Sequence, residues 1–369
     1  MAPRLDLQPV RSLAIALCLC GCSGSEGDAF SPFSTGADEA TSTAGDDPGS
    51  SDAGSSDASS TDASSTDASS TEAGESSTGI KLDVLPDEDL PADGNAEAGE
   101  EGCQKVDFLF VIDNSNSMSD EQQLLIDSFP GFIAAIEDAL PSAADFHIGV
   151  TKTDVFGFDD DPVPDPANPC AYQLGGLLTH ATPPDAKTGT GLDCEFESGA
   201  NYMIEGPLLA DEFACVAAVG TKGNTGERQA EATLAALDDQ NACSAGFLRK
   251  DALTVVVVIT DEDDDWSAPD SDAQTNAQAW YEGVLAAEDG IDGNLVFVLI
   301  SGGSPKWPDC GPLDLMTMTG ADDSPKLSAW AQKFGNHELS SVCSPGYADS
   351  LAAAIGVIET ACSQFEPIP

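Results

Sequence analysis

Three small oxygen-bearing side chains follow an apolar run near residue 110. The run covers residues 108–112 and ends at Asp113, with Ser115 and Ser117 at the next alternate positions. Carboxylate and hydroxyl oxygens are the ligands that a hard divalent cation prefers. The spacing Asp-x-Ser-x-Ser therefore indicates a cation site. The simpler alternative is a turn followed by a helix cap, since Asp and Ser are also common there.

A strand and a helix must position this motif. Residues 108–112 are apolar and either branched or aromatic, which predicts a short buried strand. A helix is predicted to start at Ser119, with Gln122 at capping-box spacing. Its apolar residues recur every three or four positions: Leu125, Phe129, Phe132, Ile136 and Leu140. The three oxygen donors then lie at the carboxyl end of a strand, where open α/β sheets bind ligands.

Further along the chain, apolar runs alternate with helical patterns. Strands are predicted at residues 146–155, 253–260 and 295–300, with a short edge strand at 172–179. Helices are predicted at residues 208–219, 227–239, 273–287, 327–334 and 347–362. The unbroken aliphatic run 253–260 is typical of a strand buried on both faces of a parallel sheet. The pattern predicts an α/β fold with a doubly wound, mostly parallel central sheet flanked by helices.

The motifs together resemble the von Willebrand factor A (VWA) domain and its metal-ion-dependent adhesion site. In that family three loops supply the site: D-x-S-x-S, a threonine from a Gly-rich turn before a helix, and an aspartate after an apolar strand ending T-D. This chain matches them in order with Asp113, Ser115 and Ser117, then Thr221, then Asp261. Thr221 fits better than Thr225, because the family's threonine stands several residues before the helix. The resemblance covers residues 103 to about 362 and implies a Rossmann-like VWA fold.

The resemblance also implies a ligand. Hydroxyl groups would hold Mg²⁺ (or Ca²⁺ or Mn²⁺) and leave one position open for an Asp or Glu side chain of another protein. The chain departs from the family where Glu262 follows Asp261, because glycine is common at that position. Glu262 and Asp263 open an acidic run that extends to residue 265. These acids either face solvent, fill the open position or hold a calcium ion of their own.

Two other functions remain open. The domain could be a structural or envelope-assembly module whose metal site is vestigial or purely structural. A metal-dependent hydrolase is less favoured, because no histidine is near the three loops and the sequence contains no H-E-x-x-H or G-x-S-x-G motif. We therefore expect a binding protein and not an enzyme, with Trp266, beside the acidic run, as a candidate contact for the ligand.

The composition limits the partners. The 369 residues include 65 acidic and 13 basic side chains, for a formal net charge of −52. A surface of this charge repels nucleic acids and anionic lipid headgroups. We expect a protein partner, and contact with a membrane only through a lipid anchor.

The cysteines indicate an oxidising compartment. Three of the 11 lie in the leader, and the remaining eight contain no C-x-x-C pair that would favour zinc. Four disulfides are therefore predicted, although spacing does not determine their connectivity. The working hypothesis pairs Cys103–Cys362, Cys170–Cys194, Cys215–Cys243 and Cys310–Cys343.

The first hundred residues resemble a lipoprotein leader and a tether. Residues 1–21 combine Arg4 and Arg11 with a short apolar run, and Leu19-Cys20-Gly21-Cys22 resembles a bacterial lipobox, with Cys22 as the lipidated residue. An ordinary cleaved signal peptide is the alternative. Residues 22–102 are rich in Ser, Thr, Ala, Gly and acid, which predicts a disordered acidic linker. Residues 103–369 would form the VWA-like domain, with a disulfide-bearing insertion around 156–199. The leader favours an anchor in the outer membrane of the cell envelope, and either face of that membrane stays open, including exposure at the cell surface.

Overall fold

The computed structural model describes residues 102–141, 143, 145–154, 168–182, 191–223, 226–266, 272–303 and 310–367. The predicted signal peptide, the lipidation site Cys22, the tether up to residue 101 and parts of the predicted insertion at 156–199 lie outside the described residues. Among the helices of the described ranges, none is long and apolar enough to cross a membrane.

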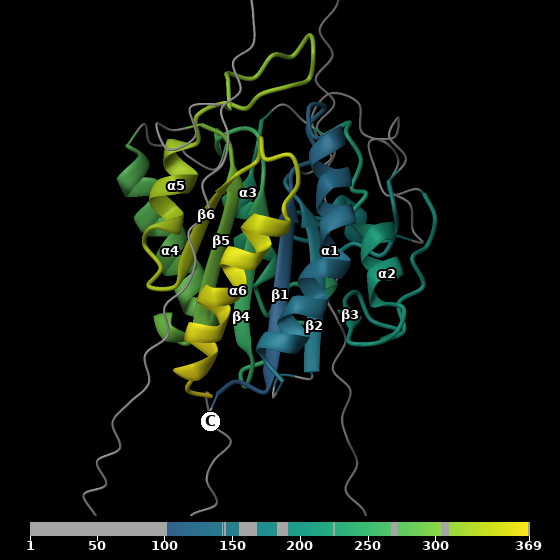
Figure 1. The fold of residues 1–369 in the computed structure, drawn as a ribbon, viewed down its shortest axis with the longest axis vertical. Coiled ribbons are helices and arrows are strands. Elements are labelled where there is room, and N and C mark those ends of the chain that lie inside the picture. Colours follow the sequence, from purple (N-terminus) through teal and green to yellow (C-terminus); the bar gives the residue numbers. More distant parts are fainter. Residues whose placement is uncertain are drawn as a thin grey trace, which may run out of the picture. The chain divides into compact units, whose positions relative to one another are not determined.

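A six-stranded sheet forms the centre of the domain, in the order β3-β2-β1-β4-β5-β6 (Figure 1). All neighbouring pairs are parallel except β2 and β3, which are antiparallel. The strands are β1 Lys105–Ile112, β2 Asp145–Lys152, β3 Met203–Ile204, β4 Leu253–Ile259, β5 Leu295–Ser301 and β6 His337–Ser341. The prediction of a doubly wound, mostly parallel α/β sheet is confirmed.

Helices cover both faces of this sheet (Figure 1). One face carries α1 Ser119–Ala139, α2 Leu209–Val216 and α6 Ala348–Ser363. The other carries α3 Gln229–Ala236, α4 Ala273–Ala287 and α5 Pro325–Ala331. Short 3₁₀ turns lie at Pro169–Tyr172, Ala242–Ser244 and Asp292–Asn294. Two apolar layers result, one on each side of the strands.

Successive side chains of the central strands point to opposite faces of the sheet and so contribute to both apolar layers. Phe108 and Phe110 of β1 face the α1 side, whereas Leu109 and Val111 face the α4 side. On the α1 side, the ring of Phe213 from α2 lies 4.9 Å from that of Phe110 and 3.5 Å from that of Phe129. β1 and β4 are buried on both faces, and after Asp107 and Thr254 their residues are wholly apolar up to Ile112 and Ile259. That places the loops after β1 and β4 at the carboxyl edge.

Two local predictions were wrong, and one strand was missed. Residues 172–179 form no edge strand, because Gly175 adopts φ 65° and breaks the extended run; β3 takes that edge instead. The strand β6 was missed because its sequence, HELSS, is polar. Gln122 belongs to no capping box, since its side-chain amide donates to the backbone carbonyls of Asp113 (3.0 Å) and Gly220 (2.8 Å).

All eight cysteines of the domain form disulfides, as predicted. The pairs Cys103–Cys362 and Cys310–Cys343 are confirmed. The other two predicted pairs are wrong, because the structure joins Cys170 to Cys243 and Cys194 to Cys215. The 3₁₀ turn at Cys170 packs beside the one at Cys243, where Asn201 bonds to both segments. Cys194 instead lies against α2, which carries its partner Cys215, so this disulfide is nested within the pair Cys170–Cys243.

A buried carboxyl far from the carboxyl edge makes the fold sensitive to pH. Glu288 follows α4 and is fully buried; Thr254 donates a hydrogen bond of 2.7 Å to its Oε1, and its Oε2 has no partner. Burial raises the pKa of Glu288 to about 7, although the Thr254 hydrogen bond and Lys250 oppose the shift.

We predict that Glu288→Gln stabilises the protein at pH 8. The native state binds an extra proton between about pH 4.5 and 7, so stability falls as pH rises through this window. The neutral amide removes this loss, which we expect to be worth about 1–2 kcal/mol at pH 8 and nothing near pH 4.5. Urea unfolding at both pH values, in chelator, measures it. Glu282→Gln, on the exposed face of α4, is the control, and an equal gain at both pH values would contradict the interpretation.

Candidate metal centre

Asp113 is fixed where β1 and β4 end. Its side chain is fully buried, and its backbone N–H donates to the carbonyl of Ile259 at 3.0 Å. Oδ1 accepts the backbone N–H of Ser115 at 2.7 Å, and Oδ2 accepts the Thr260 hydroxyl at 2.6 Å. The hydroxyls of Ser115 and Ser117 lie 3.3 Å apart and are buried with it. The first loop therefore presents a carboxylate and two hydroxyls in one place.

The second loop lies directly against the first. Gly223 donates its backbone N–H to the Asn114 carbonyl at 2.8 Å, and a Cβ at Gly223 would meet that oxygen at 2.7 Å. The Gln122 amide described above bridges Asp113 and Gly220 from the other side. Thr221, half-buried between Gly220 and Gly223, is thus carried on a loop that is bonded to the first loop. Close packing of this kind requires glycine at residue 223.

The third loop begins at Asp261, directly after β4. Asp261 is 1% exposed, and among the residues that the structure describes neither of its carboxylate oxygens has a hydrogen-bond partner. Burial and the nearby charge of Asp113 raise the pKa of Asp261 to about 7, while the Ser117 hydroxyl acts in the opposite direction. Leaving two buried carboxylate oxygens unsatisfied is costly unless a proton or a cation accompanies them.

Glu227, which sequence reasoning missed, belongs to the same group of acids. It precedes α3 and is 1% exposed; the Thr153 hydroxyl donates to its Oε2 at 2.7 Å, and its Oε1 has no partner. One oxygen each from Asp113, Glu227 and Glu262 lie within 4.8 Å of one another. The only sequence signal for Glu227 was its position directly after the Gly-rich turn. An acid at that position is also common at the start of an ordinary helix.

The acids of the run 262–265 have different environments. Glu262 is half-buried in the group just described. Asp263 accepts the backbone N–H groups of Lys326 (3.2 Å) and Leu327 (3.1 Å) at the start of α5. Asp264 accepts the N–H of Ala230 (2.9 Å) at the start of α3, and exposed Asp265 pairs with Lys326 at 2.8 Å. Of the two proposed extra ligands, Glu262 lies with the site, and Asp263 is engaged at a helix start.

Like charges dominate this edge. Burial raises the pKa of Asp113, of Glu227 and of Glu262, the last to about 8, and the Asp113 charge raises those of Glu227 and Glu262 further. In the part of the chain that the structure describes, no ion pair involves Asp113, Glu227, Asp261 or Glu262. Carboxylate and hydroxyl oxygens are the donor set of Mg²⁺ and Ca²⁺, so the residues present fit a hard cation.

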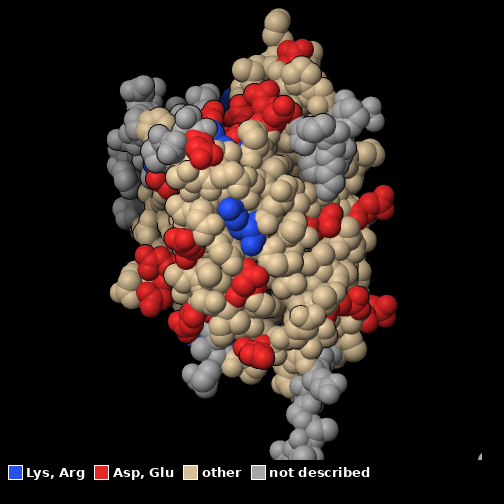
Figure 2. Space-filling model, turned by 90° about the vertical axis from the view of Figure 1, so that its left-hand side faces the viewer, with Lys and Arg blue, Asp and Glu red and all other residues tan. Residues whose placement is uncertain are grey.

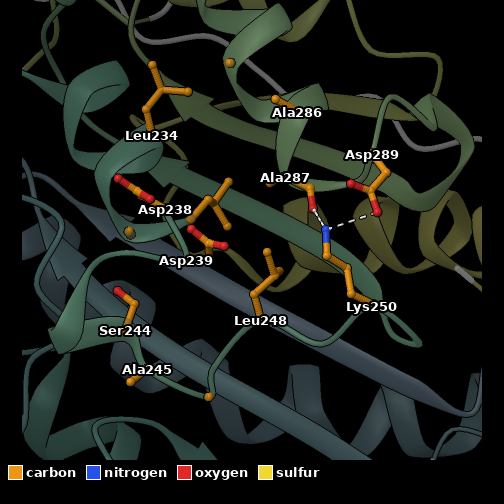
Figure 3. Close-up of a pocket in the computed structure, with 14 residues that line it drawn as sticks. Leu234, Asp238, Asp239, Ser244, Ala245, Leu248, Lys250, Ala286, Ala287 and Asp289 are labelled. Carbon is orange, nitrogen blue, oxygen red and sulfur yellow. Dashed lines mark hydrogen bonds and ion pairs between the residues drawn. The ribbon is translucent and has the colours of Figure 1, made fainter. Parts of the chain in front are cut away.

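A pocket of about 560 Å³ lies at the opposite, amino end of β4, between α3 and α4 (Figure 3). Its floor is apolar, with Leu234, Leu237 and Leu248, and three aspartates line its rim. Lys250 donates to the Ala287 carbonyl at 2.8 Å and pairs with Asp289 at 3.4 Å, as the dashed lines show. The only cation among the lining residues is thus satisfied by the protein itself, which makes this pocket the weaker candidate.

Comparisons with known proteins give limited similarity. No protein-family model and no curated protein matches the chain. Similar solved structures include a von Willebrand factor type A protein from Catenulispora acidiphila, with a TM-score of 0.34, 14% identity, and coverage of 70% of this chain and 43% of that one. Two structures of proximal thread matrix protein 1 from the mussel byssus have TM-scores of 0.36 and 0.31, with 11% and 13% identity.

These two structures cover 71% and 70% of this chain and 49% and 47% of the other. The matched part is thus less than half of each similar chain. The fold assignment therefore rests on the strand order and helix layers described above.

We predict that Glu227→Gln stabilises the metal-free protein at pH 8. Folding transfers the Glu227 carboxyl from water to a site beside Asp113, which costs free energy whether it stays ionised or takes up a proton. The amide keeps an oxygen for Thr153 and removes the charge, for an expected gain of about 2 kcal/mol. Urea unfolding in chelator measures the gain. Asp265→Asn, in the exposed part of the acidic run, is the control; a loss of stability in Glu227→Gln would contradict the prediction.

Proposed function

We propose that this chain is a tethered binding protein that holds a divalent cation through Asp113, Ser115, Ser117, Thr221 and Asp261, and binds a protein ligand through that cation. The observation that carries the proposal is the pair of partnerless, buried carboxylate oxygens of Asp261 in the same loop cluster as Asp113 and the two serine hydroxyls. A cation supplies the missing counter-charge. Mg²⁺ is the first candidate, with Ca²⁺ and Mn²⁺ as alternatives.

The donor types explain how such a site would bind a partner. Serine and threonine hydroxyls are neutral, so they coordinate the cation without cancelling its charge. Mg²⁺ keeps water ligands in such a shell, and an incoming carboxylate can replace one of them. An Asp or Glu side chain on the partner is therefore the expected contact, with half-exposed Trp266 on the adjoining loop as a candidate neighbour.

Charge at long range opposes the same partner. Acidic side chains outnumber basic ones on the face shown in Figure 2 and gather near its top, in line with the net charge of −52. Repulsion of this kind is screened over about 8 Å at physiological ionic strength, whereas the cation acts at contact. Binding of an acidic partner should therefore strengthen as salt is added, in contrast to most charge-assisted complexes.

The anchor and tether complete the proposal. We place the domain in the cell envelope, attached to the outer membrane through lipidated Cys22 and the linker 22–102. Four disulfides support an oxidising compartment, because such bonds are rare in the cytosol. A linker of about eighty residues, if disordered as its composition predicts, would span about 50 Å on average. That reach would carry the binding edge well away from the membrane surface.

A structural role for the cation is the second candidate. Glu227 and Glu262 favour it, because carboxylates that complete the coordination of a single ion leave no position for a partner. A hydrolytic role is less favoured: the three histidines bond to Phe247, Thr179 and Phe334, and none of these contacts involves an acid of the site. Turnover of an ester, peptide or phosphate substrate that is lost in a site variant would support the hydrolase instead.

Divalent cations are expected to raise the melting temperature of the purified protein. Saturation at 100 times Kd stabilises the native state by about 2.7 kcal/mol, which corresponds to several degrees. Asp113→Ala should abolish the shift, and Ser117→Ala, which removes one hydroxyl only, should reduce it. Glu282→Gln is the control. Melting that is independent of Mg²⁺, Ca²⁺ and Mn²⁺ would refute the cation site.

Capture of a partner separates adhesion from a structural role. Immobilised protein in Mg²⁺ is expected to retain a partner from envelope or extracellular proteins, and to release it in chelator or in excess of an acidic peptide. Asp113→Ala should retain none. A partner that remains bound in chelator, and that binds Asp113→Ala equally well, would show that the interaction does not pass through the cation.

A further inference from the structure

The geometry points to a second cation subsite, formed by Asp113, Glu227 and Glu262, which shares Asp113 with the Asp-x-Ser-x-Ser site and prefers Ca²⁺. The inference rests on the cation binding proposed above, and goes beyond it in the number of ions, the residues and the selectivity. No sequence motif indicates this subsite. It depends on Glu227, which approaches from the start of α3.

The three carboxyls suit calcium by their number and type. One oxygen from each lies within 4.8 Å of the others, close enough for all three to ligate one ion. Ca²⁺ takes six to eight oxygen ligands in a flexible geometry, whereas Mg²⁺ keeps several waters and is usually held by one or two carboxylates. A site with three carboxylates therefore favours Ca²⁺.

The environment of Glu227 is a second observation that supports the subsite, independent of the distances among the three carboxyls. Its Oε1 is buried and has no hydrogen-bond partner in the described part of the chain, although the rest of the residue is held firmly. The Thr153 hydroxyl fixes Oε2, and the backbone N–H of Trp266 donates to the Glu227 carbonyl at 3.1 Å. A Cβ at Gly226 would lie 3.0 Å from the Trp266 ring, so this segment is closely packed. The carboxyl is therefore held beside Asp113 and Glu262 with one oxygen unsatisfied.

The subsite is distinct from the position next to Asp261. Asp261 does not belong to the group whose oxygens are within 4.8 Å of one another. It lies instead beside Asp113 and the Ser117 hydroxyl. One dication at either position would leave two of the four carboxyls without a counter-charge, whereas two dications neutralise all four. Two ions flanking Asp113 account for the whole cluster.

Asp113 has the capacity to bridge two ions. A carboxylate offers about four lone-pair positions. The Ser115 N–H uses one on Oδ1 and the Thr260 hydroxyl uses one on Oδ2. The Ser115 hydroxyl also lies within hydrogen-bond reach of Asp113 and would have to turn toward a bound ion. With that change, one position on each oxygen is open to an ion, and the hydrogen bonds from the Ser115 N–H and the Thr260 hydroxyl are kept.

Counting bound calcium tests the inference. Flow dialysis of the full chain with radioactive Ca²⁺, in 150 mM KCl to suppress diffuse binding to surface acids, is expected to give two ions per chain. Glu227→Gln is expected to bind one and to keep its response to Mg²⁺. Ser117→Ala is expected to lower affinity at the other position only. Asp265→Asn, which removes an exposed charge from the same acidic run, should still bind two.

The outcomes separate this inference from the proposed function. One ion in the wild-type chain, with the same affinity in Glu227→Gln, would overturn the second subsite and leave the first intact. One ion that is lost in Glu227→Gln would also overturn it, because Glu227 would then be a ligand of a single site. No bound Ca²⁺ in any chain would overturn the second subsite, and melting that is also independent of Mg²⁺ and Mn²⁺ would remove the proposed function as well. Melting curves and near-ultraviolet circular dichroism in chelator establish that each variant is folded.

Discussion

Burial of several carboxyls at one edge of the sheet is the constraint on which the rest of this structure depends. Asp113, Glu227 and Asp261 are all buried, and Glu262 is half-buried beside them. Their charges repel one another, and water is largely excluded. Such a group must bind either protons or a cation. Replacing these residues should make the metal-free protein more stable, and the cation site proposed above would offset their cost.

The fold tolerates the repulsion among these buried carboxyls because hydrogen bonds and disulfides hold the surrounding segments in place. The Thr260 hydroxyl alone contacts Asp113, Gln229 and Glu262, and so connects the ends of β1 and β4 to the start of α3. Cys103–Cys362 joins the two ends of the domain across a sequence separation of 259. A disulfide that closes so long a loop strongly lowers the conformational entropy of the unfolded chain. The three remaining disulfides hold segments outside the sheet.

The acidic run after β4 shows how one sequence feature serves two purposes. Asp263 and Asp264 accept backbone N–H groups at the starts of α5 and α3, where a negative charge is stabilised by unpaired N–H groups and the helix dipole. These two contacts attach the third loop to two helices on the same face of the sheet. Glu262, one position earlier, is thereby directed toward Asp113 and Glu227. The positions of the capping residues thus determine which acid of the run joins the cluster.

The sequence alone determined the sheet, most of its strands and helices, and the three loops that carry Asp113, Thr221 and Asp261. It could do so because the alternation of buried strands with helical patterns is local, and because parallel strands end at a common edge. The tertiary structure decided the features that depend on distant contacts: the pairing of Cys170 with Cys243, the bridging role of Gln122 and the entry of Glu227 into the acid cluster. The physical reason is that packing between elements far apart in the chain decides which side chains meet. The spacing of residues along the sequence contains no information about that packing.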